Sequence, residues 1–142
     1  FAGGRVARTA LDMATAKSAL PTGQLVALAI LCNVLVCLAV WMSFSAKSTT
    51  DKVLVVVPPV AAFVAAGFEH SIANIFLIPY GLAIKAWAGP EVWAAIQATA
   101  ASYPALTSGG AAHNIIVSTL GNLAGGSLLV GVVYWFVYLR RP

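Results

Sequence analysis

The chain has 142 residues, of which 61% are hydrophobic and 8% are charged, and its formal net charge is +4. A soluble domain carries roughly 25% charged residues. This small number of polar side chains cannot cover a water-facing surface. Much of the surface must therefore face lipid. The basic residues separate apolar runs instead of clustering, which is typical of the flanks of membrane spans and excludes a nucleic-acid-binding patch.

The N-terminal segment, residues 4–20, combines helical spacing with interleaved charges. It lacks the apolar core that a signal peptide has. The sequence begins at Phe1 and not at methionine, and we interpret this start as a cut point within a longer protein.

Three apolar stretches follow, at residues 24–44, 53–84 and 115–139. A straight helix crosses a bilayer with about 20 residues, so the first and third stretches each predict one span. The second stretch is too long for one untilted span and too short for two.

Prolines and glycines interrupt this second stretch. Proline removes a backbone donor and clashes with the preceding turn, whereas glycine gives the backbone freedom to turn. We predict one broken span, with halves at 53–63 and 68–84 and an irregular piece at 64–67. Irregular backbone at membrane depth is tolerated only where it is buried in protein or lines a cavity. The interrupting residues are Pro58, Pro59, Gly67, Pro79 and Gly81.

The connection between the second and third stretches predicts a short surface helix. Pro90 and Glu91 are suited to the first turn of a helix, and we expect it to run to about Ala101.

The basic residues near the span ends predict an orientation. With three spans, the loop that bears Lys47 and Lys52 lies on the same side as the tail that bears Arg140 and Arg141. The positive-inside rule makes this side, and therefore the C-terminus, cytoplasmic. The residues that oppose this orientation are Arg5, Arg8 and Lys17.

Glu69 and His70 lie at the middle of the second stretch. A charged group at the bilayer centre costs at least a few kcal/mol, so such residues usually face a bundle interior, a pore or a proton path. His70 shares a helical stripe with Phe63 and Asn74, which predicts a pore lining with a central polar site. Glu69 points about 100° away on the helix, so we interpret it as an organiser that faces a neighbouring helix. A purely structural role stays open for both residues.

Asn33 lies at the midpoint of the first stretch, with Val36 about one turn further along the same face. The amide predicts a hydrogen bond to His70 or Glu69, or alternatively only adhesion between helices. Lys17 precedes this stretch and would attract anions to a pore mouth. The alternative for Lys17 is an ordinary flanking lysine.

Gly121 and Gly125 form a GxxxG motif in the third stretch. This motif permits close helix approach, so we predict helix packing or an oligomer contact. Cys32 and Cys37 point in different directions on a helix, and we interpret them as packing residues with no metal site. Motifs of hydrolases, P-loop proteins and zinc enzymes are missing from the sequence, so we predict a protein that is not an enzyme and has no cofactor.

Three segments together resemble the formate/nitrite transporter family. Its fourth transmembrane helix is similar to residues 31–42 (LCNVLVCLAVWM), its broken fifth helix to residues 65–76 (AAGFEHSIANIF), and its sixth to residues 119–126 (TLGNLAGG) with 133–135 (VYW). The string GFEHSIAN is highly specific. The resemblance implies an all-α integral membrane fold of three transmembrane helices, the middle one broken. These helices would form the second inverted repeat of an aquaporin-like six-helix protomer that assembles as a pentamer.

The same resemblance implies roles for individual residues. His70 matches the central histidine of the pore and proton relay, and Glu69 supports it. Lys17 matches the lysine of the vestibule that attracts anions. The polar companions of the histidine are Asn33 and Asn74. The residues of the hydrophobic constrictions are Phe63 and Val36.

The implied function is transport of a small monovalent weak-acid anion, such as formate, nitrite or hydrosulfide, across the bacterial inner membrane. The transport would be either proton-coupled or channel-like. Residues 1–142 match only the C-terminal half of the family domain, so we expect that this chain alone does not form a working pore. The alternative is a truncated membrane fragment or assembly module that does not transport.

Overall fold

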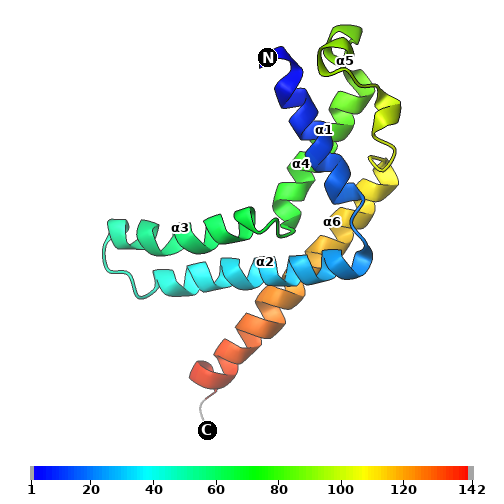
Figure 1. Ribbon diagram of the computed structural model, residues 1–142. Helices are drawn as coiled ribbons and strands as arrows, with labels where there is room; N and C mark the ends of the chain where they lie inside the picture. Colours follow the sequence, from blue (N-terminus) through cyan, green and yellow to red (C-terminus); the bar gives the residue numbers. More distant parts are fainter. Residues whose placement is uncertain (1, 141–142) are drawn as a thin grey trace. The chain divides into compact units, whose positions relative to one another are not determined.

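The computed structural model describes residues 2–140, and the regular structure within this range is helical (Figure 1). Phe1 and Arg141, to which the sequence assigned a cut point and part of the basic tail, lie outside the described residues. The chain forms two compact units. The first consists of Phe1–Pro21 with Ser71–Ile116, and the second of Thr22–His70 with Val117–Pro142.

In the first unit, the amphipathic helix α1 (Arg5–Ser18) lies alongside α4 (Ser71–Trp87), as Figure 1 shows. Their interface buries Leu11 and Ala14 from α1 and Ile78 from α4. Gly81 permits the close approach, because a Cβ atom at this position would overlap Ala14 and lie 3.3 Å from the carbonyl oxygen of Ala10.

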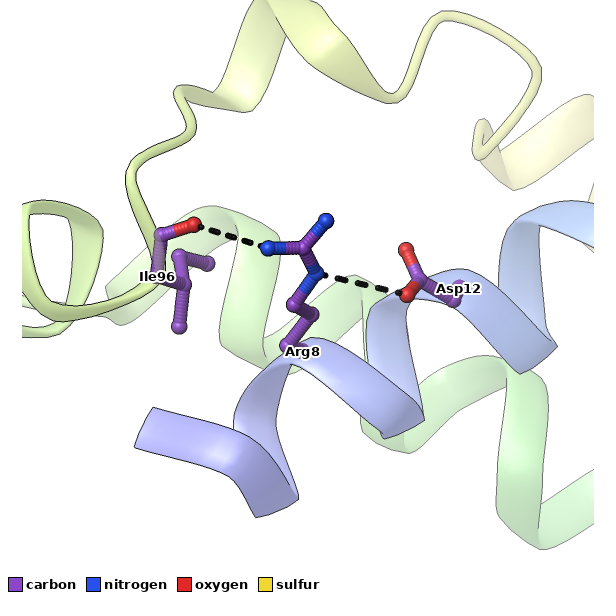
Figure 2. A network of polar contacts seen from close by, with 3 residues as sticks. All are labelled: Arg8, Asp12 and Ile96. Atoms are coloured by element: carbon purple, nitrogen blue, oxygen red, sulfur yellow. Dashed lines mark hydrogen bonds and ion pairs between the residues drawn. The ribbon is translucent and has the colours of Figure 1, made fainter. Parts of the chain in front are cut away.

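A short helical segment, η1 (Ala2–Gly4), precedes α1 and contacts α5 (Pro90–Ile96). The sequence predicted a helix from Pro90 to about residue 101, and this C-terminal bound is wrong. The helix ends at Ile96 because Gln97 adopts the left-handed conformation (φ 52°). Figure 2 shows how α1 holds this end: Arg8 donates to the carbonyl oxygen of Ile96 (3.5 Å) and pairs with Asp12 (3.8 Å).

The connection after α5 contains η2 (Ala100–Ser102) and leads to α6 (Ser108–Leu123). Lys85, near the end of α4, fixes it by donating from Nζ to the carbonyl oxygens of Tyr103 (2.7 Å) and Leu106 (2.8 Å). Burial raises the pKa of Tyr103, and the neighbouring Asp12 carboxylate raises it further.

In the second unit, α2 (Thr22–Ser43) packs beside α3 (Thr49–Ala65), as Figure 1 shows. A capping box begins α3, since the Ser48 hydroxyl accepts from the backbone of Asp51 and the Asp51 carboxylate accepts from the backbone of Ser48, both at 3.1 Å. This is the arrangement that satisfies the free amide groups of a helix N-terminus. The helix continues through Pro58 and Pro59 and ends at Ala65.

Residues 66–70 separate α3 from α4 and are not helical. Within them, Gly67 has a φ of 67°, in the left-handed region that favours glycine. The backbone amide of Phe68 returns to the carbonyl oxygen of Phe63 at 3.0 Å and closes the turn.

The remainder of the second unit continues from α6 into two π-helical segments, η3 (Ala124–Val132) and η4 (Trp135–Leu139). In the described part of the chain, two helical runs are long and apolar enough to cross a membrane, Thr22–Ser43 and Ser108–Leu139. A third is added if α4 and α5, which are bent by 112°, are counted as one span. The helices α3 and α4 have 17 residues each, which is short of the roughly 20 that a straight span needs.

Candidate functional site

The break between α3 and α4 is held by a buried asparagine that the sequence reasoning missed. Asn122, on α6, is 7% exposed. Its side-chain Nδ2 donates to the carbonyl oxygen of Glu69 (2.9 Å) and to that of Ala29 on α2 (2.8 Å). Buried backbone oxygens outside a helix need such partners, so one amide stabilises the break and ties it to α2.

His70 is the last residue of the break, and its ring lies against that of Phe63 from the end of α3. The ring centroids are 5.6 Å apart and the planes are inclined at 47°. Both side chains are half-buried. This ring contact is made across the non-helical residues 66–70 and not along a continuous helical face. Glu69, beside them in sequence, is 2% exposed.

On α2, Asn33 donates from Nδ2 to the main-chain carbonyl oxygen of Asn122 at 2.6 Å. This bond runs between helices, and its partner belongs to α6 and not to the break. Val36 is half-buried on the same helix. Asn122 therefore contacts α2 twice, as a side-chain donor at Ala29 and as a backbone acceptor from Asn33.

Gly121 and Gly125 lie where α6 and η3 pack against α2. A Cβ atom at Gly121 would lie 2.6 Å from that of Ala29, and one at Gly125 would overlap the carbonyl oxygen of Ile30. The two backbones approach this closely only because side chains are missing from α6 and η3 here. This proximity brings the amide of Asn33 within reach of the α6 backbone.

Lys17 and Asn74 belong to the first unit and share a second buried asparagine, Asn114. The side chain of Asn114, on α6, donates to the carbonyl oxygen of Lys17 (2.9 Å) and accepts from Nδ2 of Asn74 (2.8 Å). Asn74 and Asn114 are both fully buried. Lys17 itself is half-buried.

The sequence contained a usable signal for Asn122, because it is an amide inside an uncharged apolar stretch, as Asn33 is. Asn114 was harder to find, since it stands at the start of the stretch beside His113. Among the described residues, no group of three or more His, Cys, Asp or Glu side chains is arranged to hold a metal ion.

Long apolar helices, and an interrupted helix with buried amide ties, are the features of an α-helical membrane protein. The family model described as formate/nitrite transporter matches residues 1–136. The chain belongs to this family.

Individual relatives agree with this assignment. The chain is 50% identical to the formate channel FocA of Escherichia coli strain K12 over 119 residues, which are 83% of this chain and 42% of FocA. It is 44% identical to the formate channel FocB of the same strain over 117 residues, 82% of this chain and 42% of FocB. These relatives are named as channels and not as enzymes. The chain spans about two fifths of their length.

Among solved structures, the chain is similar to one described as a pentameric formate channel with formate bound. The TM-score is 0.90 at 45% identity, with 97% of this chain and 55% of that chain covered. A second structure, described as an FNT family ion channel, gives a TM-score of 0.69 at 32% identity, with 90% of this chain and 45% of that chain covered. The helical arrangement is therefore that of the family's channels.

Proposed function

We propose that this chain supplies part of a pore that passes a small monovalent weak-acid anion across a membrane, with formate as the first candidate. The observation that carries the proposal is His70, at the end of a helix break and against Phe63, in a chain 50% identical to a protein named a formate channel. Nitrite and hydrosulfide are further candidates, because they are also small anions of weak acids.

The proposed architecture is that of half a pore. Residues 1–142 form the C-terminal half of the family domain, the second inverted repeat of an aquaporin-like six-helix protomer, with spans at about 24–44, 53–84 and 115–139. The similarity to part of a pentameric channel supports this role and favours a homopentamer. The proposed location is the bacterial inner membrane, with the C-terminus in the cytoplasm.

The proposed mechanism follows from the cost of moving an anion into an apolar constriction. Removing an isolated carboxylate from water costs tens of kcal/mol by Born estimates. Lys17 attracts the anion, and the positive end of α4, which begins directly after His70, favours negative charge. His70 then donates a proton, so that the neutral acid passes the apolar side chains of Phe63 and Val36. Asn33, Asn74 and Glu69 support this step.

A chimera tests the proposal: this chain replaces the matching segment of E. coli FocA and is reconstituted in liposomes. We expect formate uptake that rises with an inward proton gradient and that His70→Asn abolishes. His113→Asn is the matched control, since His113 is an exposed histidine outside the proposed pore, and uptake should be unchanged. A chimera that passes no formate would overturn the transport proposal. Unchanged uptake and pH dependence in His70→Asn would overturn the relay alone.

A second candidate function is a membrane assembly module that does not transport. It is favoured by the close glycine-lined contact of α2 with α6 and η3. The 142-residue chain alone, reconstituted in liposomes, distinguishes the two roles. We expect no formate flux from this chain by itself and flux from the chimera. Flux from the chain alone would refute both the half-pore architecture and the assembly role.

A further inference from the structure

A groove opens between α2 and η3 beyond the point where the two helices touch. At Gly125 a Cβ atom would overlap the carbonyl oxygen of Ile30, and at Gly126 it would lie 3.1 Å from Sγ of Cys37. At Gly131, by contrast, no atom of α2 lies within 4 Å of such a Cβ atom. The two helices therefore diverge between residues 126 and 131, and the groove between them has a volume of about 180 Å³ and apolar walls.

An aromatic cluster stands at the wide end of this groove, and two of its members, Trp41 and Tyr134, line it. The ring centroid of Trp41 is 5.5 Å from that of Tyr134 and 5.9 Å from that of Tyr138 on η4. In the described part of the chain, the indole N–H and the two phenol hydroxyls make no hydrogen bond. Rings of this kind, with an apolar body and a polar tip, are typical of the level at which lipid chains meet their headgroups.

Exposed cations follow the aromatic cluster on both helices. Trp41 lies near the end of α2, and Lys47 stands in the loop that comes next. Tyr138 lies near the end of η4, and Arg140 follows that helix directly, with its guanidinium carbon 5.3 Å from the ring centroid of Phe136. Because the rings of Trp41 and Tyr138 are in contact, both basic ends lie on the same side of the second unit.

The charge at this end of the second unit is positive. Lys52, in the first turn of α3, adds a third exposed cation. The described residues of this unit include two acids, Asp51 and Glu69. The Asp51 carboxylate accepts from the backbone of Ser48 in the capping box, and Glu69 lies beyond the opposite end of α3. A complementary ligand is therefore apolar along the groove and carries a negative group that accepts hydrogen bonds.

We propose that an anionic phospholipid binds here, with one acyl chain in the groove between α2 and η3. Its phosphate and ester oxygens, which only accept, meet the three unused aromatic donors. Its negative charge faces Lys47, Lys52 and Arg140, as basic residues beside a span attract anionic lipids. The inference goes beyond transport and rests only on the proposed membrane location, which the two membrane-length helical runs support.

The test is native mass spectrometry of the detergent-solubilised chain and of the FocA chimera, each mixed with equal amounts of phosphatidylglycerol and phosphatidylcholine of the same acyl chains. We expect both proteins to retain the anionic phosphatidylglycerol preferentially over the zwitterionic phosphatidylcholine. Lys47→Gln and Arg140→Gln should each reduce this preference about fivefold, which corresponds to roughly 1 kcal/mol for one cation at a lipid surface. Arg5→Gln, at an exposed cation of the first unit, is the matched control and should leave the preference unchanged.

Gly131→Leu tests the groove itself, because the new side chain would occupy the space that Gly131 leaves open. This variant should retain less of both lipids, and unchanged retention would overturn the placement of the acyl chain. The charge variants are at exposed positions, so they decide the proposal if Gly131→Leu does not fold.

Three results would overturn the proposal as a whole. The first is equal retention of the two lipids by the unsubstituted chain, or an unchanged preference in both charge variants. The second is retention by the chain but not by the chimera, because the FocA segments would then cover the groove. The third is displacement of phosphatidylglycerol by an equal concentration of inorganic phosphate, which would assign the cations to a free anion. A chimera that keeps the lipid preference but passes no formate would refute only the proposed transport.

Discussion

Replacing Gly125 by alanine tests the close contact between η3 and α2. The new methyl group would overlap the carbonyl oxygen of Ile30 and lie 3.0 Å from its carbonyl carbon and 3.1 Å from its Cα. These are backbone atoms of a helix, which cannot rotate away as a side chain would. The two helices must therefore separate.

The expected cost follows from three contributions, two that destabilise and one that stabilises. Overpacking of this kind costs typically 1–3 kcal/mol, and separation of the helices weakens the 2.6 Å bond from Asn33 to the backbone of Asn122, worth about 1 kcal/mol. The greater helix propensity of alanine offsets about 1 kcal/mol. We expect a net loss of roughly 2 kcal/mol, or about 4–8 °C in Tm for a chain of this size.

The assay is thermal unfolding of the purified protein in detergent, followed by circular dichroism. Gly109→Ala is the matched control in the same continuous helical run, because the nearest atom to its new methyl group would be Thr107 Oγ1 at 3.9 Å, an ordinary contact. It should unfold at or slightly above the temperature of the unsubstituted protein. An equal Tm for Gly125→Ala, or equal losses for the two variants, would refute the argument from close packing.

Two further predictions concern the break and the start of α3. Asn122→Leu removes the side-chain donor to the carbonyl oxygen of Glu69, at about 1–3 kcal/mol for a buried group, and should accelerate amide hydrogen exchange around residues 66–70. Leu123→Ala, at an exposed neighbour, should not, and equal exchange in the two variants would contradict the role of the amide. The hydrogen bonds with Ser48 lower the pKa of Asp51, so its capping contribution is complete above the ordinary aspartate pKa of about 3.9 and is lost as the pH falls through the lower folded-state pKa. The rate of amide hydrogen exchange in the first turn of α3, corrected for its intrinsic pH dependence, should therefore rise on acidification. The Asp51→Asn variant should show no such rise. A rise that persists in this variant would show that another group causes it.

The break in the second apolar stretch could be predicted in part: the irregular piece was expected at residues 64–67, and the structure has it at 66–70, between the end of α3 and the start of α4. Glycine at position 67 indicated an interruption, and the interruption lies at residues 66–70 because Gly67 adopts the left-handed conformation that the sequence made available. The end of α5 could not be predicted in this way, because Gln97, a residue with no preference for that conformation, ends the helix.

The contacts of the candidate site were harder to predict than its residues. The two rings of Phe63 and His70 are close in sequence, and they meet across the non-helical residues 66–70. The partner of Asn33 is 89 residues away, and the partners of Asn114 are 40 and 97 residues away. A helical period gives the face that a side chain occupies, but it does not give the neighbouring helix or the register of packing. The close contact at Gly121 and Gly125 sets that register.

The bond between Asn122 and Glu69 has a consequence for genetic experiments on the Glu-His pair. Asn122 binds the main-chain oxygen of Glu69 and leaves the carboxylate out of this tie. Any amino acid at position 69 supplies a main-chain oxygen, so this hydrogen bond does not use the Glu69 side chain. Substitutions at position 69 therefore report on the carboxylate, and substitutions at position 122 report on the anchor. The two roles of one buried position are separable by mutation.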